Sequence, residues 1–176
     1  QRALELGADG YLTKPLDNEV FIKHLEDIIE DKIELTYWGV RGTLPVPGKK
    51  SLKYGGNTCC VSIQFPKNNL FILDAGSGIK QLSNHLLSTQ GPKLHAKILI
   101  SHPHWDHINA LPFFVPLYIP GNEFEILGAS HGDITMRELI SAQMDGVYFP
   151  ITMKEFASRT YFRNLKEEEI EINNIK

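Results

Sequence analysis

The stretch that decides the fold runs Ile98-Leu99-Ile100-Ser101-His102-Pro103-His104-Trp105-Asp106-His107-Ile108. Its first residues are apolar and mostly β-branched, which predicts a buried strand that ends near Ile100. Four side chains that can bind a metal ion follow within six residues, at His102, His104, Asp106 and His107. Imidazole nitrogens and carboxylate oxygens coordinate zinc and similar divalent cations, and crowding so many polar groups at a strand end is costly unless they bind something. The stretch therefore predicts a metal site.

The spacing divides these four side chains into two pairs. Alternate residues of an extended segment share a face, so His102 and His104 can bind one ion together. If the chain then turns into a helix, Asp106 and His107 can face a neighbouring second ion. A surface loop that happens to be rich in histidine is the alternative interpretation, because a motif alone remains a hypothesis.

The pattern H-x-H-x-D-H resembles the metal-binding motif of the metallo-β-lactamase superfamily. Three upstream segments share the resemblance, particularly to the branch that acts on phosphoesters: Trp38-Gly39-Val40-Arg41-Gly42-Thr43, Gly55-Gly56-Asn57-Thr58 and Leu73-Asp74-Ala75-Gly76-Ser77-Gly78. The resemblance implies an α/β layered fold in which residues 32–176 form the first half of an αββα sandwich. The remaining ligands are then expected beyond Lys176. It also implies that Asp74 holds the metal-bearing loop by hydrogen bonds, while a simple helix cap is the alternative role for Asp74.

The resemblance also implies a chemistry. Two divalent ions, zinc with manganese or iron as alternatives, would activate a water molecule and hold an oxygen of the substrate. Asp106 would be the catalytic residue, because it would bind metal and orient the nucleophile. We expect a metal-dependent hydrolase acting on a phosphodiester or related ester. A non-catalytic signalling domain that binds metal or nucleotide is one alternative. A di-iron redox centre is another, although the related branch with that centre has glutamate where this chain has His104.

The first 31 residues are expected to belong to a different domain. Residues 8–16, Ala-Asp-Gly-Tyr-Leu-Thr-Lys-Pro-Leu, resemble the last strand of a response-regulator receiver domain. In that family the lysine that matches Lys14 contacts a phosphoryl group on an aspartate of an earlier strand, which would lie before Gln1. The resemblance implies that residues 32–176 are the output domain of a two-component regulator and that a histidine kinase is a partner. An unrelated α/β tail with a turn proline is the alternative, since Lys-Pro is a weak signal.

Composition limits the remaining function classes. The 176 residues are 42% hydrophobic, which is enough for a core, and 18 basic and 21 acidic residues give a net charge of −3. That balance gives no strong signal for nucleic-acid binding. The adjacent cysteines Cys59 and Cys60, with no signal peptide or long apolar segment, predict a cytoplasmic protein without a membrane partner. The expected partner is a small-molecule or nucleotide phosphoester substrate, and a homodimer remains open.

The periodicity of apolar residues predicts the other elements. We expect a strand over 33–40, a hairpin of strands 59–65 and 70–73, and a helix with Ile79, Leu82, Leu86 and Leu87 on one side. A short or kinked helix over 108–118, a strand over 124–127, a helix after Asp133 and a last strand over 170–175 should follow. His131 is a candidate further ligand, with a strand-to-helix turn as the alternative. Tyr148 and Phe149 could either wall the pocket or pack the structure.

Overall fold

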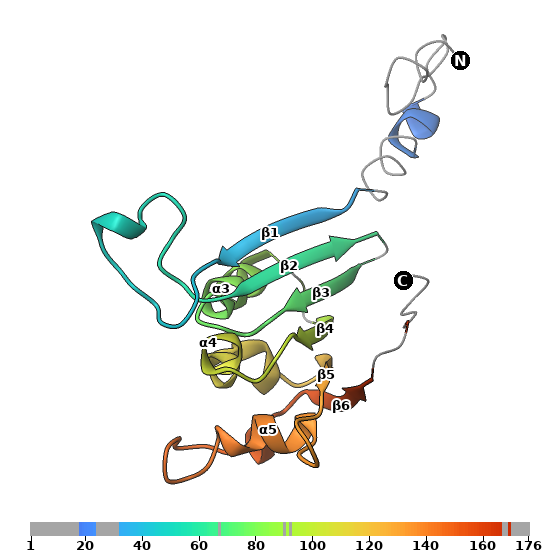
Figure 1. Ribbon diagram of the computed structural model, residues 1–176. Coiled ribbons are helices and arrows are strands. Elements are labelled where there is room, and N and C mark those ends of the chain that lie inside the picture. Colours follow the sequence, from blue (N-terminus) through green and yellow to red (C-terminus); the bar gives the residue numbers. More distant parts are fainter. Residues whose placement is uncertain are drawn as a thin grey trace.

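A mixed six-stranded sheet organises the protein (Figure 1). The computed structural model describes residues 18–23, 32–66, 68–89, 91, 93–166 and 169. The strands lie side by side in sequence order: β1 (Glu34–Gly39), β2 (Cys60–Phe65), β3 (Asn69–Leu73), β4 (His95–Ile100), β5 (Glu123–Ala129) and β6 (Arg159–Leu165). The pairs β1–β2 and β2–β3 are antiparallel, whereas β3 to β6 run parallel to one another. The predicted α/β fold class is confirmed.

Helices supply the parallel crossovers that such a sheet requires. Helix α3 (Ile79–Thr89) joins β3 to β4, and α5 (Met136–Ala142) lies between β5 and β6. The shorter elements are η1 (Lys49–Ser51), α4 (Trp105–Ile108), η2 (Leu111–Phe113), η3 (Val115–Tyr118) and η4 (Met153–Glu155). None of the helices in the described part of the chain has both the length and the apolar character that a membrane span requires.

The main core lies between the sheet and these helices. Ile72, Ile98 and Ile126 pair across β3, β4 and β5, and all three are completely buried. Leu82 and Leu86 of α3 belong to the same buried cluster. Burying each such side chain stabilises the fold by roughly 1.5–3 kcal/mol, so this layer holds the central strands in register.

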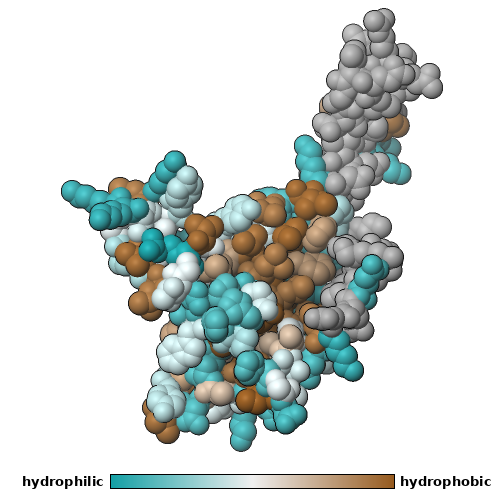
Figure 2. Space-filling view, viewed as in Figure 1, coloured by the Kyte–Doolittle hydropathy of each residue, from teal (hydrophilic) through white to brown (hydrophobic). Residues whose placement is uncertain are grey.

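The opposite face of the sheet carries a second, smaller apolar cluster. Phe71 and Leu127 are buried there, and Ile63, Leu99 and Leu165 pack against them. Figure 2 shows hydrophobic residues gathered over the middle of the sheet on the face in view. Successive side chains along the central strands point to opposite faces, and both faces carry apolar residues, which is typical of parallel strands.

The hairpin of β2 and β3, helix α3 and the strands β1, β4 and β5 confirm the sequence predictions, and the ends of these strands lie within two residues of the expected ones. Two details were wrong. Leu87 is 47% exposed, so it is not part of the core face of α3. Residues 108–118 form the end of α4 and two short 3-10 helices because Pro112 and Pro116 lack the N–H that a longer helix needs. The helix expected after Asp133 is α5, and Thr135 is its N-cap.

Strand β6 was not predicted from the sequence. Some other predicted segments lie outside the residues that the structure describes. Residues 18–23 are helical. Residues 1–17, including Lys14, and the strand expected over 170–175 lie outside the described residues. The domain boundary at 31–32 and the receiver-like segment therefore remain predictions.

Replacing Thr135 by alanine is expected to lower the free energy of unfolding by about 1 kcal/mol. The Thr135 hydroxyl accepts a hydrogen bond from the Glu138 N–H, and the Glu138 carboxylate accepts one from the Thr135 N–H at 2.8 Å, forming a capping box for α5. Urea unfolding followed by circular dichroism measures the change. Ser141→Ala is the control, because Ser141 is exposed in the same helix and outside the cap. An equal loss in both variants would contradict the role of the cap.

Candidate metal centre

The four predicted metal ligands lie where β4 ends, at the carboxyl edge of the parallel strands. The chain stays extended as far as His104, whose backbone angles are φ −65° and ψ 148°, and the single turn of α4 then begins at Trp105. Nε2 of His102 lies 3.0 Å from Nδ1 of His104. The ring centroids of His102 and His107 are 4.1 Å apart. The structure therefore brings all the histidines of the motif together.

Asp106 is held in this cluster by the backbone of a distant loop. Its Oδ2 accepts a hydrogen bond from the Thr43 N–H at 2.8 Å and lies 3.4 Å from Nε2 of His107. The hydrogen bond from Thr43 is the main cause that lowers the pKa of the Asp106 carboxyl, and the nearby His107 and His102 contribute further. Asp106 is consequently a carboxylate at neutral pH and an available ligand.

Asp74 follows β3 and ties the metal-bearing loop to the sheet. Its Oδ1 accepts a hydrogen bond from the Ser101 N–H at 2.8 Å. Its Oδ2 lies 2.9 Å from Oγ of Ser101 and 2.8 Å from Nδ1 of His107. Because β3 and β4 are parallel neighbours, Asp74 and Ser101 leave the sheet at the same edge. Asp74 thus sits in the loop and does not cap α3, which begins at Ile79.

These hydrogen bonds determine which ring nitrogen of His102 and of His107 is free. A carboxylate only accepts, so His107 donates its Nδ1–H to Asp74 and keeps the lone pair on Nε2. The Ser101 hydroxyl gives its only hydrogen to Asp74 and can therefore accept one from Nδ1 of His102, 3.0 Å away. His102 likewise keeps a free lone pair on Nε2. This orientation by outer hydrogen bonds is what metal-binding histidines require.

The donor set fits divalent cations. Two ligands bound to one tetrahedral zinc ion at about 2.0–2.1 Å are about 3.3 Å apart. The donors of His102 and His104 are 3.0 Å apart, and those of Asp106 and His107 are 3.4 Å apart. Each pair supplies two ligands: within the described part of the chain, no three His, Cys, Asp or Glu side chains form a group that could hold one ion. Further ligands would have to complete each site, and the ligand assignments remain predictions.

The fold resembles that of a solved diphosphatase. That structure is described as a new diphosphatase from the PhnP family, and it matches with a TM-score of 0.50 and 20% sequence identity. The match covers 80% of this chain and 54% of the other, so this chain spans about half the length of that enzyme. The PhnP-family enzyme has the metallo-β-lactamase fold, which agrees with the resemblance carried by the motifs. No family model and no curated protein matches this chain.

Close packing joins the other motif segments to the site. The Ala75 N–H donates to the carbonyl of His107 at 2.7 Å, and the Gly76 N–H donates to the carbonyl of Cys59 at 2.9 Å. A Cβ on Gly76 would overlap the carbonyl oxygen of Asp106 and the hydroxyl of Thr58. Glycine is therefore required at position 76, where these three segments meet. Motif segments that are far apart in the sequence are thus packed against one another beside the metal motif.

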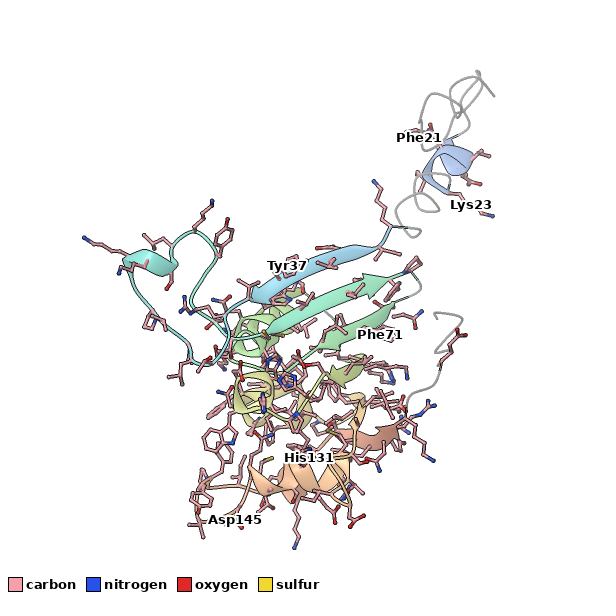
Figure 3. All side chains as sticks on the ribbon, viewed as in Figure 1. Phe21, Lys23, Tyr37, Phe71, His131 and Asp145 are labelled. Atoms are coloured by element: carbon pink, nitrogen blue, oxygen red, sulfur yellow. The ribbon has the colours of Figure 1, made fainter. Side chains whose placement is uncertain are left out.

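The site residues that act through their backbone or hydroxyl groups were not predicted from the sequence. Thr43, with φ 71°, presents its N–H to Asp106, and Ser101 connects Asp74 with His102. Both residues lie in quoted motif segments, but their polar contacts have no spacing signal of their own. His131, the candidate further ligand, is exposed between β5 and α5 (Figure 3), where its backbone bridges Ile134.

Replacing Asp74 by asparagine is expected to weaken metal binding by about 10–100-fold. The amide has one acceptor atom in place of two. It must therefore lose a hydrogen bond from Ser101, or point its N–H₂ group at Nδ1 of His107 and move the ring proton to Nε2. Competition with a coloured zinc chelator measures the affinity. Asp133→Asn is the control because Asp133 is exposed in the turn before α5, and equal affinities for the two variants would contradict the orienting role.

Proposed function

We propose that this chain carries the metal-binding part of a metal-dependent hydrolase that acts on phosphodiesters or related phosphoesters. The observation that carries the proposal is the paired donor geometry: two donor pairs 3.0 and 3.4 Å apart, with Asp74 and Ser101 leaving Nε2 of His102 and His107 free. The similar fold of a diphosphatase supports phosphoester chemistry over lactam hydrolysis. The two ions are proposed to be zinc, with manganese or iron as alternatives.

Each residue of the metal motif has a separate proposed role. His102 and His104 would hold one cation, and Asp106 and His107 the other. Bound cations would supply an activated water molecule and neutralise charge that develops on the phosphoryl group. Asp106, ionised and held by the Thr43 N–H, would also orient the attacking water. Asp74 would keep His107 in the tautomer that binds metal, and the exposed ring of His104 leaves one side of the site open to substrate.

The proposed setting is a two-component regulator. This proposal is supported only by the sequence of residues 8–16. Lys14 would contact a phosphorylated aspartate, and a histidine kinase would be the partner. Cytoplasmic localisation belongs to the same proposal.

Metal-dependent turnover of a simple diester tests the proposed function. The purified full-length protein is stripped with chelator, reloaded with zinc, manganese or iron, and assayed with bis-p-nitrophenyl phosphate beside the lactam nitrocefin. We expect phosphodiester turnover that needs added metal. His104→Ala should remove turnover and lower metal content together, while the matched variant His131→Ala should do neither. Metal binding without turnover of any phosphoester would favour the non-catalytic signalling domain instead.

A further inference from the structure

A projecting arm connects β1 to β2 beside the metal site. We define the arm as residues 44–56; Figure 1 shows it leaving the body of the molecule at the end of β1 and returning to the start of β2. Its base is bound to the metal motif, because the neighbouring Thr43 donates its N–H to Asp106. The N–H groups of Val40 and Arg41 both donate to the carbonyl of Asn57, which closes the base.

The tip of the arm is held by its own hydrogen bonds. The Val46 N–H donates to the carbonyl of Gly56 at 2.9 Å, and the Gly55 N–H donates to the carbonyl of Ser51 at 2.8 Å. The Ser51 hydroxyl donates to the carbonyl of Val46, and Ser51 is only 8% exposed. A Cβ on Gly56 would overlap the carbonyl oxygen of Val46, so the two legs of the arm touch. The arm is thus a closed loop that presents the side chains of its tip outward.

Those outward side chains are basic, aromatic and apolar. Lys49, Lys50 and Lys53 lie on the arm, and residues 41–58 contain no aspartate or glutamate, although the whole chain has a net charge of −3. Leu52 is 82% exposed and Tyr54 is 72% exposed. The ammonium group of Lys53 lies 4.9 Å from the centre of the Tyr54 ring. Figure 2 shows hydrophilic and hydrophobic residues side by side on this projection.

We propose that the arm binds single-stranded nucleic acid and that such a strand is the substrate of the neighbouring site. Lysines attract the phosphates of a strand, and exposed aromatic side chains stack on its bases. A nucleic-acid strand has a phosphodiester at every nucleotide. One phosphodiester can therefore reach the metal site while the adjacent nucleotides are bound by the arm. An anionic lipid surface would also attract the lysines, but its phosphodiester head groups carry no bases that could stack on the exposed ring of Tyr54. The choice of substrate rests on the proposed phosphodiesterase function, whereas binding to the arm does not.

Binding of the arm to a strand is tested by fluorescence anisotropy with a labelled single-stranded oligonucleotide of 12 nucleotides. The measurement is made at several salt concentrations, with chelator present so that metal-dependent cleavage cannot occur. The triple variant Lys49→Gln, Lys50→Gln, Lys53→Gln is expected to bind at least about tenfold more weakly and to flatten the slope of log K against log salt by about 2. Tyr54→Ala should weaken binding by about tenfold with the slope unchanged. The matched control, Lys32→Gln, Lys93→Gln, Lys154→Gln, changes the charge equally at exposed lysines away from the arm and should bind as the wild type does.

Several results would overturn the inference. One is a wild type that does not bind the strand, and another is a control variant that weakens binding as much as the arm variant does. A third, from a parallel measurement with phosphatidylserine vesicles, is an arm variant that loses binding to the vesicles but not to the strand. Wild-type turnover of bis-p-nitrophenyl phosphate separates this inference from the proposed function. Turnover without strand binding defeats the arm alone. Arm-dependent strand binding without any turnover defeats the hydrolase and leaves the arm as a nucleic-acid-binding surface.

Discussion

Asp106→Ala is expected to reduce kcat/KM for a phosphodiester by about 10³-fold, equivalent to about 4 kcal/mol of transition-state stabilisation. The variant loses a metal donor and the carboxylate that would orient the attacking water. It also leaves the Thr43 N–H without the acceptor that now lies 2.8 Å from it, and it removes the second donor of the pair, which lies 3.4 Å from Nε2 of His107. Steady-state kinetics with bis-p-nitrophenyl phosphate at saturating metal measure the effect.

Two further variants separate lost chemistry from lost folding. Asp106→Asn keeps an oxygen that can accept from Thr43 but removes the charge, so it should fold normally and still lose most of the activity. Asp133→Ala removes an exposed carboxylate outside the metal motif and should keep wild-type kinetics. Activity of Asp106→Ala within about tenfold of wild type would contradict the role assigned to Asp106, since loss of a positioned catalytic group costs more than this.

Gly76→Ala is expected to destabilise the protein by about 3 kcal/mol, which places it among severe packing substitutions. The added Cβ would overlap the carbonyl oxygen of Asp106 and the hydroxyl of Thr58, and it would lie 2.8 Å from the carbonyl oxygen of Cys59. Two of these three atoms are backbone atoms, so no side-chain rotation can relieve the overlap. The loop that carries Asp106 must shift, and metal binding should weaken with stability.

The control for this variant is Gly91→Ala. Within the part of the chain that the structure describes, a Cβ on Gly91 would have no atom within 4 Å, so the same chemical change should alter stability by less than about 0.5 kcal/mol. Thermal unfolding of the two variants side by side measures the difference. Equal melting temperatures for Gly76→Ala and the wild type would show that the three motif segments are not packed as described.

The metal motif could be predicted because a buried strand and the spacing of ligands each leave a local signal. Ile98 and Ile100 mark β4, and the polar side chains from His102 onward mark its end. The orientation of Asp106 could not be predicted in this way. Its partner is a backbone N–H 63 residues away at Thr43, which depends on a positive φ angle and not on any side-chain pattern.

The missed strand and the misplaced side chains have comparable physical causes. Strand β6 contains the charged residues Arg159 and Arg163 and is only partly buried, so its apolar alternation is weak. Its position is set by seven paired residues along β5 and by the ion pair of Arg159 with Glu123 at 2.7 Å, both of which are tertiary. Leu87 satisfies the helical period and is nevertheless 47% exposed, because the core ends beside Leu86. Periodicity predicts a face but not its width.

The metal content of the intact natural protein, purified without chelator and measured by mass spectrometry beside its Asp106→Ala variant, tests the central claim most directly. We expect close to two zinc, manganese or iron ions per chain in the wild type. The variant should retain fewer, because one donor pair is then reduced to His107. The absence of bound metal from the intact wild-type protein would contradict the account and leave a signalling or scaffolding role as the better explanation of the cluster.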